Sequence, residues 1–371
     1  MELPGFVATL LPEEALQKLL KKQALSPYEW EGIPLVRLAH DAGRALPRGT
    51  VLAPDGLIPA YPRIRRVLHL QEGIKRHFSQ GPFWVEEKMD GYNVRVALVK
   101  GRALAFTRGG FVCPFSMDRL AELLNLRFFQ AHPELILCGE VVGPENPYNT
   151  EPVAHVKEDV QMFVFDVLDR RGRPLPPPER YHMLQGLGIQ GVRHWGPFGA
   201  EDIEEVRRLV LELDSQGREG MVLKDASGTA LKYVTPGSCL RDILATAGML
   251  AELPAGFYVQ RLWRAFFFSH EFGQVLPQEY LLQLIKGLYE ENLRVLREVQ
   301  EGGSLREDFT IRVNRAETVE ALIRHLRHTG VGVLLKSLEP QGDKWVARFQ
   351  RVFQKGTREL RRRLRGHGFY D

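Results

Sequence analysis

Short stretches of the chain alternate hydrophobic and polar residues with a period of two, and glycine-containing turns separate them. This period places the hydrophobic side chains on one face of a β-strand. The stretches that read as strands in the first two thirds of the chain lie at 83–91, 92–99, 103–110, 134–143, 160–169, 220–225 and 229–234. A regular exchange of strand and helix is missing between them, which favours an α+β fold with antiparallel strands.

Other segments place apolar residues three and four positions apart, which is the spacing of one face of a helix. Ile203, Val206, Val210 and Leu213 have this spacing, and Gly217 follows as a helix cap. Further helices are predicted at 11–22, 117–126, 243–253, 280–300, 317–328 and 351–366.

These patterns divide the chain into four predicted domains. Residues 1–62 form a small N-terminal domain of one helix and short strands, and 63–242 form the strand-rich domain. Residues 243–303 are helical, and 304–371 combine two strands, a helix and a basic C-terminal helix.

The composition indicates where the protein is located in the cell, but it does not indicate a binding partner. The chain has 371 residues, 44% of them hydrophobic and 26% charged, which is typical of a globular protein. A net charge of +4 is too small to indicate a nucleic-acid partner by itself. The three cysteines form no CxxC pair, the N-terminal stretch lacks a signal-peptide pattern, and no run of eighteen apolar residues occurs. We therefore expect a cytoplasmic protein with no membrane span.

The sequence VEEKMDGYNVRV carries the candidate chemistry. Lys88 ends a predicted strand, and the glycine of KMDG, Gly91, allows the backbone to turn there. The amine of Lys88 is thereby exposed at the turn, where Asp90 can hold it or a metal ion. A KxDG sequence alone also fits an ordinary solvated turn.

Further motifs follow Lys88 in a fixed order. The set KMDG, TRGG, GE, FVFD, EGMVLK and LKYV resembles the covalent nucleotidyltransferase superfamily of DNA ligases, RNA ligases and mRNA capping enzymes. YPRIRRVL before the lysine and QKGTRELRRRLRGHGFYD at the C-terminus are similar to the homodimeric archaeal-type RNA ligases. The resemblance runs from about Tyr61 to the C-terminus, and it implies that 63–242 is an adenylation domain of the nucleotidyltransferase (ATP-grasp-like ligase) type.

A lysine that attacks phosphorus must first lose its proton, and a free lysine has a pKa near ~10.4. We expect Lys224, Lys232 and a bound divalent metal to lower the pKa of Lys88 by repulsion of like charge. The same cations would neutralise the α-phosphate during an in-line displacement.

The resemblance also implies roles for the remaining motif residues. The implied catalytic residues are Lys88, Asp90, Glu219 and Lys232. Of these, Asp90 and Glu219 are implied to bind Mg²⁺ or Mn²⁺. The nucleotide site is formed by Glu87, Lys88, Arg95, Arg108, Glu140, Phe165, Lys224 and Lys232. Phe163 and Phe165 share a strand face, and the resemblance favours Phe165 as the residue that stacks on adenine. As isolated residues, the phenylalanines would more often belong to the core, and the acids would fit a solvated surface as well.

The last motif departs from the pattern of many family members, which carry two lysines spaced by two. Here LKYV offers Lys232 but has Val234 in the second place. Either Lys224 supplies a second cation, or Lys232 acts alone.

The acceptor is read from the segment after Val234. DNA ligases and capping enzymes resembling this core append an OB-fold barrel of about five strands, whereas helices follow here. The resemblance makes 243–303 a homodimer interface, and the basic tail is suited to phosphate contacts.

We therefore expect an ATP-dependent RNA ligase. AMP passes from Lys88 to the 5′-phosphate of single-stranded RNA, and a 3′-hydroxyl then attacks, within one molecule or between two. The alternatives are a DNA ligase, a capping-type nucleotidyltransferase, or a non-enzymatic RNA-binding dimer.

Overall fold

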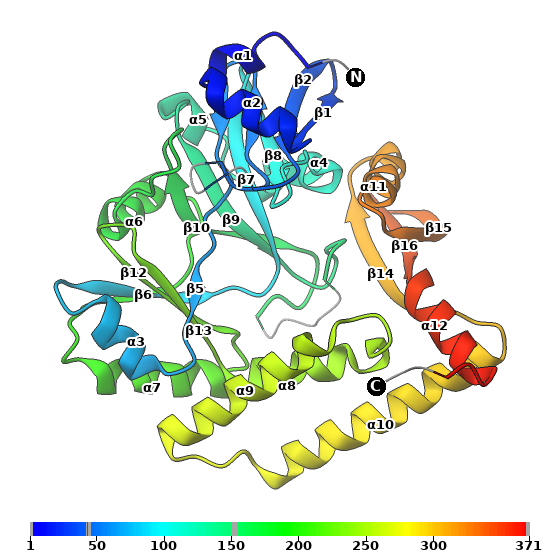
Figure 1. Cartoon of the computed structure of the whole chain (residues 1–371). Helices are drawn as coiled ribbons and strands as arrows, with labels where there is room; N and C mark the ends of the chain where they lie inside the picture. The colour runs from blue at the N-terminus through cyan, green and yellow to red at the C-terminus, as the bar shows by residue number, and fades with distance from the viewer. Residues whose placement is uncertain (1–2, 42, 44–45, 150–154, 369–371) are drawn as a thin grey trace.

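The computed structural model describes residues 3–41, 43, 46–149 and 155–368. Figure 1 shows an N-terminal unit at the top, the strands of the central region below it, long helices along the bottom and a C-terminal unit at the right. The ends of the predicted terminal domains, including the last three residues of the HGFYD tail, lie outside the described residues.

The N-terminal unit packs a short helix layer on a four-stranded sheet of order β1-β2-β3-β4. The sheet consists of β1 (Leu25–Trp30), β2 (Ile33–Leu38), β3 (Val51–Ala53) and β4 (Gly56–Ile58), with α1 (Val7–Leu10) and α2 (Glu13–Lys21) preceding it. The amphipathic helix expected at 11–22 is therefore present. Its Leu19 is fully buried against this sheet, together with Val36 and Leu52.

Two sheets form the centre of the molecule. The first has the order β10-β9-β7-β8, with β7 (Tyr92–Val99), β8 (Arg102–Thr107), β9 (Ile136–Val142) and β10 (Gln161–Leu168). The second has the order β11-β6-β12-β13-β5, with β5 (Arg65–Arg66), β6 (Phe83–Lys88), β11 (His194–Phe198), β12 (Gly220–Asp225) and β13 (Ala230–Val234). All pairs in both sheets are antiparallel except β5 with β13.

Helices cover the outer faces of both sheets. α3 (Leu70–His77) and α7 (Ile203–Ser215) share a hydrophobic core with the second sheet, and Val206, Val210 and Leu213 point into it as their spacing predicted. The remaining helices of this region are α4 (Pro114–Leu123), α5 (Phe128–Ala131) and α6 (Pro177–Gly186). The N-terminal sheet packs on part of the other face of the first sheet, around Ala97, Leu104 and Ile136. The rest of that face lines a site together with the second sheet.

The helical segment begins earlier than its pattern suggested. α8 (Pro236–Ala245) starts after Thr235, whose hydroxyl accepts from the backbone N–H of Ser238, and it runs across the boundary expected at 242/243. The expected helix at 243–253 is broken, because α8 ends and a 3₁₀ turn, η1 (Ala247–Met249), follows. The long helices α9 (Ala255–Phe272) and α10 (Gln278–Gln300) complete the segment.

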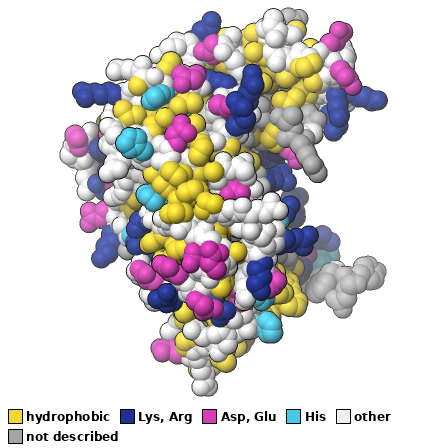
Figure 2. All heavy atoms as spheres, turned by 90° about the vertical axis from the view of Figure 1, so that its left-hand side faces the viewer, with side chains coloured by type: hydrophobic (Ala, Val, Ile, Leu, Met, Phe, Trp, Pro, Cys, Tyr) yellow, Lys and Arg dark blue, Asp and Glu magenta, His cyan; other side chains and the backbone are white. Residues whose placement is uncertain are grey.

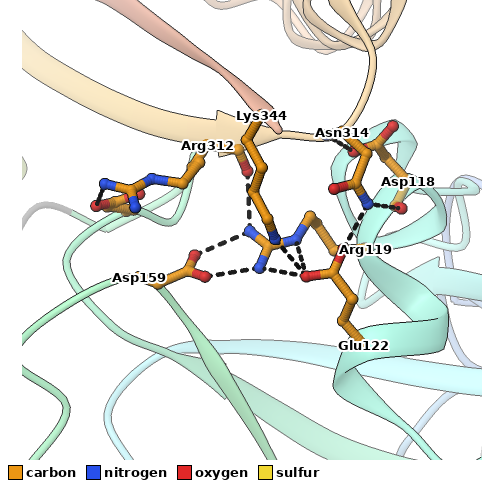
Figure 3. A network of polar contacts seen from close by, with 8 residues as sticks. Asp118, Arg119, Glu122, Asp159, Arg312, Asn314 and Lys344 are labelled. Carbon is orange, nitrogen blue, oxygen red and sulfur yellow. Dashed lines mark hydrogen bonds and ion pairs between the residues drawn. The ribbon is translucent and has the colours of Figure 1, made fainter. Parts of the chain in front are cut away.

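The C-terminal unit is a three-stranded sheet of order β14-β16-β15 with two helices. Its elements are β14 (Arg306–Val313), α11 (Ala316–His328), β15 (Gly332–Gln341), β16 (Lys344–Val352) and α12 (Gln354–Leu364). It docks on α4 through a polar network (Figure 3). In that network, buried Arg119 donates to Asp159 at 2.8 and 2.6 Å and to the carbonyl oxygen of Arg312 at 2.9 Å.

The predicted α+β class is confirmed, and none of the sheets in the described part closes into a barrel. Among the described helices, none is both long and apolar enough to cross a bilayer.

Candidate active site

A cleft of about 430 Å³ opens between the two central sheets, within the size range of small-molecule sites. One wall comes from β6, β12 and β13, and the other comes from β7, β9, β10 and the turn after β8. Its lining includes Tyr61, Glu87, Lys88, Asn93, Arg108, Glu140, Tyr148, Phe165, Val222, Lys224 and Lys232. Most residues predicted for the site are thus brought together from strands far apart in sequence.

Lys88 lies at the end of β6, where the cleft meets a second cavity of about 310 Å³. Its Nζ is 2.5 Å from Oε2 of Glu219, and one fifth of the side chain is exposed. Next to Lys88 in the sheet stands Gly220, with a φ of +148°. A Cβ at Gly220 would lie 2.2 Å from the carbonyl oxygen of Tyr233, so no side chain fits between Lys88 and β13.

The pKa of Lys88 shifts in the direction opposite to the prediction. Burial lowers the pKa, but Glu219, Glu140 and Asp90 outweigh it and raise the pKa above the ordinary lysine value. The expected depression is therefore wrong for the side chains alone, because acids and not cations are the nearest charged neighbours of this amine.

The acids around Lys88 repel one another. Burial and then the carboxylate of Glu219 raise the pKa of Asp90 from 3.8 to about 7. Burial, opposed by Lys88 but reinforced by Glu219 and Asp90, raises the pKa of Glu140 to about 8. A group of carboxylates that resist ionisation in this way is suited to receive a cation.

Asp90 and Glu219 are the acids predicted to hold a metal. Their carboxylates fit Mg²⁺ or Mn²⁺, which bind oxygen ligands, and Mg²⁺ retains several waters. In residues 3–41, 43, 46–149 and 155–368, no group of three or more His, Cys, Asp or Glu is arranged to hold an ion. The two carboxylates fit a metal ion that keeps water among its ligands.

Phe165 and Phe163 separate into two roles. Phe163 is buried in a cluster with Met89, Val142 and Val192, whereas Phe165 is half-buried and lines the cleft. The pairing of β10 with β9 shifts register at Phe165, and such a bulge re-aims a side chain. The ring of Tyr61 meets that of Phe165 edge-on at 5.0 Å, which leaves an aromatic wall in the cleft.

Lys224 reaches the cleft but is held in a buried ion network. Its Nζ lies 2.8 Å from Glu86 and 3.0 Å from Asp166, and it donates to the carbonyl oxygen of Phe165 at 2.7 Å. Buried Arg180 forms ion pairs with the same two acids. Tyr61 donates to Asp166 at 2.6 Å. This network was missed at the sequence level, because Glu86, Asp166 and Arg180 belong to separate segments.

Lys232 has the opposite surroundings. It is half-buried, lines the cleft, and its amine has no ion-pair partner in the described part of the chain. Burial and then the charges of Arg66, Lys88 and Arg108 lower the pKa of Lys232 to about 8. Arg108 is exposed on the turn after β8 and also lines the cleft. Lys232 and Arg108 are therefore cations available to an anionic ligand.

Two predicted nucleotide-site residues are placed differently. Arg95 is fully buried and donates to the carbonyl oxygens of Pro59 at 2.5 Å, Gly49 at 2.8 Å and Thr107 at 3.0 Å. It fastens the N-terminal unit to β8 and does not line the cleft. Glu87 lines the cleft, but its side chain forms ion pairs with Arg193 and Arg218.

Asn93 is a cleft residue that the sequence reading missed. It pairs across β7 and β9 with Glu140, and its buried Oδ1 has no hydrogen-bond partner. The resemblance singled out Arg95 alone, but the alternation along β7 places Asn93 and Arg95 on one face, and this pattern could have found Asn93.

Family models match two parts of the chain. The model described as RNA ligase covers residues 81–234, and that described as Ligase Pab1020 C-terminal region covers residues 245–367. An uncharacterised protein of Methanocaldococcus jannaschii is 26% identical in an alignment of 370 positions that covers 95% of this chain and 92% of the relative.

Solved structures resemble nearly the whole chain. Two forms of an archaeal ATP-dependent RNA ligase are 32% identical over 97% of both chains, with TM-scores of 0.86 and 0.89. A protein of Aquifex aeolicus, provisionally named an ATP-dependent DNA ligase, is 33% identical with a TM-score of 0.89. That match covers 97% of this chain and 100% of the Aquifex chain.

Proposed function

Because the chain belongs to the family of archaeal-type ATP-dependent RNA ligases, we propose that it joins RNA 5′-phosphate and 3′-hydroxyl ends through an AMP bound to Lys88. The observation that carries this proposal is the position of the Lys88 amine. It lies at the boundary of a cleft with an aromatic wall and unpaired cations, which suits adenine on one side and phosphates on the other.

In the first step the Nζ of Lys88 attacks the α-phosphorus of ATP. A nitrogen–phosphorus bond forms, the bond to the pyrophosphate oxygen breaks, and pyrophosphate leaves in line. The Lys88 ammonium must release its proton to water before this attack, and a cation held by Glu219, whose Oε2 lies 2.5 Å from the Lys88 Nζ, would favour that loss. Adenine stacks on Phe165, while Lys232 and Arg108 face the phosphates.

Asp90 and Glu219 are the residues that would hold Mg²⁺ or Mn²⁺. A cation there would offset phosphate charge and oppose the acids that raise the Lys88 pKa.

Two transfers complete the reaction. An oxygen of the RNA 5′-phosphate attacks the phosphorus of the lysine adduct, the nitrogen–phosphorus bond breaks, and Lys88 regains its proton. A 3′-hydroxyl then attacks the activated 5′-phosphorus and expels AMP. Single-stranded RNA is our proposed acceptor, with joining of two ends of one molecule included.

We assign RNA contact to α12. Lys355 and Arg358 on α12 and Arg365 at its C-terminal cap are exposed, and none has an ion-pair partner among the described residues. Arg351, which the sequence grouped with them, lies in β16 and donates to the carbonyl oxygens of Pro147 and Tyr148. On the face shown in Figure 2, at the left of Figure 1, acidic and basic side chains are interspersed, so that face offers no uniform basic path.

We further propose that the enzyme is a homodimer through 243–303. α9 and α10 expose a set of large apolar side chains, as dimer interfaces do. The most exposed are Val259, Trp263, Phe266, Leu282, Ile285 and Tyr289. The three cysteines are buried free thiols, which supports a cytoplasmic location.

A DNA ligase is the second candidate, because the Aquifex relative carries that provisional name. Sealing assays with a 5′-phosphorylated single-stranded RNA and a nicked DNA duplex separate the two. We expect RNA to be joined far faster, and preferential sealing of nicked DNA would overturn the RNA assignment. Labelling by GTP but not ATP would instead indicate a capping-type enzyme.

A further inference from the structure

The cleft has few cations free to meet the negative charge of a triphosphate. Lys224 forms ion pairs with Glu86 and Asp166, so its positive charge is already balanced. Lys232 and Arg108 remain on the lining. The strand next to Lys232 supplies one more cation, which belongs to the YPRIRRVL motif but was given no role in the sequence reading.

That cation is Arg66, in the two-residue strand β5. In the parallel pairing of β5 with β13, Arg66 stands opposite Lys232 and Arg65 stands opposite Leu231. Paired residues point to the same face of a sheet. Leu231 is buried in the core with α3 and α7, whereas Lys232 lines the cleft. Arg66 is therefore on the Lys232 face and Arg65 on the opposite face.

Arg66 is half-buried, and the Glu219 carboxylate acts on its charge without forming an ion pair with it. Its Nε is buried without a hydrogen-bond partner, and its guanidinium has no ion-pair partner within the described residues. Behind it, buried Arg264 also has an unpartnered Nε, and its Nη1 contacts the sulfur of Cys239 at 3.8 Å. Burial and then repulsion by Arg264 lower the pKa of Arg66. Cations held together in this way favour the arrival of an anion.

We propose that Arg66 binds the phosphate chain of ATP together with Lys232 and is thus a catalytic residue of Lys88 adenylation. Its guanidinium offers planar paired donors to phosphate oxygens, which a single ammonium cannot do. Negative charge builds on the pyrophosphate as its bond to the α-phosphorus breaks, and Arg66 and Lys232 then stabilise that charge. The inference rests on the proposed function, because it concerns the first step of that reaction.

The test compares Arg66→Met with Arg65→Met. Both remove one cation from β5, but the Arg65 guanidinium lies on the other face, near His77. The full-length protein is mixed with labelled ATP and the divalent metal, and the single-turnover rate of protein–AMP formation is followed over a range of ATP concentrations. We expect Arg66→Met to lower the rate at saturating ATP on the order of 100-fold, and Arg65→Met to match the wild type.

A second variant, Arg66→Lys, and a melting temperature for each variant are included in case Arg66→Met is unstable. The lysine variant retains the charge without the paired donors, so we expect it to fall between the wild type and Arg66→Met at an unchanged melting temperature. Wild-type rates in both Arg66 variants, or an equal loss in Arg65→Met, would overturn the inference. If the wild type itself forms no AMP adduct, the proposed function fails instead.

Discussion

Lys224 and Lys232 lie on neighbouring strands but differ in electrostatic surroundings. Removing one cation from a buried ion network leaves an uncompensated acid, which costs about 3–5 kcal/mol. Lys224→Met should therefore lower both the melting temperature and AMP labelling. Lys232→Met should lose labelling without loss of stability, because the native fold already lowers the pKa of Lys232 to about 8 and so disfavours its charge. Thermal melts and labelling with ATP check both variants. A Lys224→Met protein that melts like the wild type would contradict the network assignment.

The ionised carboxylate of Asp90 lowers the stability of the folded protein. The native state raises the pKa of Asp90 from 3.8 to about 7, so the folded protein binds this proton more tightly than the unfolded chain does. The stability contributed by protonated Asp90 is present below about pH 4 and is lost as the pH rises through 7.

Asp90→Asn should therefore melt at a higher temperature than the wild type at pH 8, with a gain of at least roughly 1 kcal/mol after solvent screening. The gain should shrink toward pH 4, while AMP labelling falls at every pH. Asp343→Asn, in the exposed turn between β15 and β16, serves as the control and should change neither property. A gain that does not depend on pH would contradict the shift.

At the scale of elements, the pairing of β6, β12 and β13 positions the nucleophile. Gly220 pairs with Lys88 on one side and with Val234 on the other. Gly220→Ala would place a Cβ 2.2 Å from a backbone oxygen at a positive φ, so the strands must separate.

We expect Gly220→Ala to destabilise the protein by roughly 2–4 kcal/mol and to abolish AMP labelling. Gly186→Ala, at the end of α6 with open space around its Cβ, should be neutral. Chemical denaturation measures both. Normal labelling by Gly220→Ala would show that the sheet can accept a side chain beside Lys88.

Some features of this site could be predicted from the sequence, and others depend on how the strands pair. The ordered motifs and the resemblance singled out Lys88, Glu140, Phe165 and Lys232, and all four line the cleft. Partners across distant strands are not encoded locally. Lys224 pairs with Asp166, and Arg95 donates to the carbonyl oxygen of Gly49. These partners lie far away in the sequence, so the sequence alone could not predict the two contacts.

At the scale of the whole molecule, the exposed apolar face of α9 and α10 is the proposed dimer interface. Ile285 is 66% exposed, which is unfavourable for a large apolar side chain in a monomer. Ile285→Glu would bury a charge in the proposed interface and should convert a dimer to a monomer. Gln283→Glu adds the same charge elsewhere on α10 and should leave the dimer intact.

Light scattering after gel filtration measures the oligomeric state of these variants. AMP labelling should survive in the Ile285→Glu monomer, since the described cleft is built within one chain. A monomeric wild type would contradict the homodimer proposal.

The central claim is that Lys88 becomes covalently linked to AMP, and mass spectrometry of the intact protein tests it most directly. After incubation with ATP and Mg²⁺ or Mn²⁺, we predict a single AMP adduct, mapped to Lys88 by peptide sequencing and absent from Lys88→Arg. The same preparation should then lose the adduct on addition of pyrophosphate. No adduct in the wild type, or an adduct that persists in Lys88→Arg, would contradict the account.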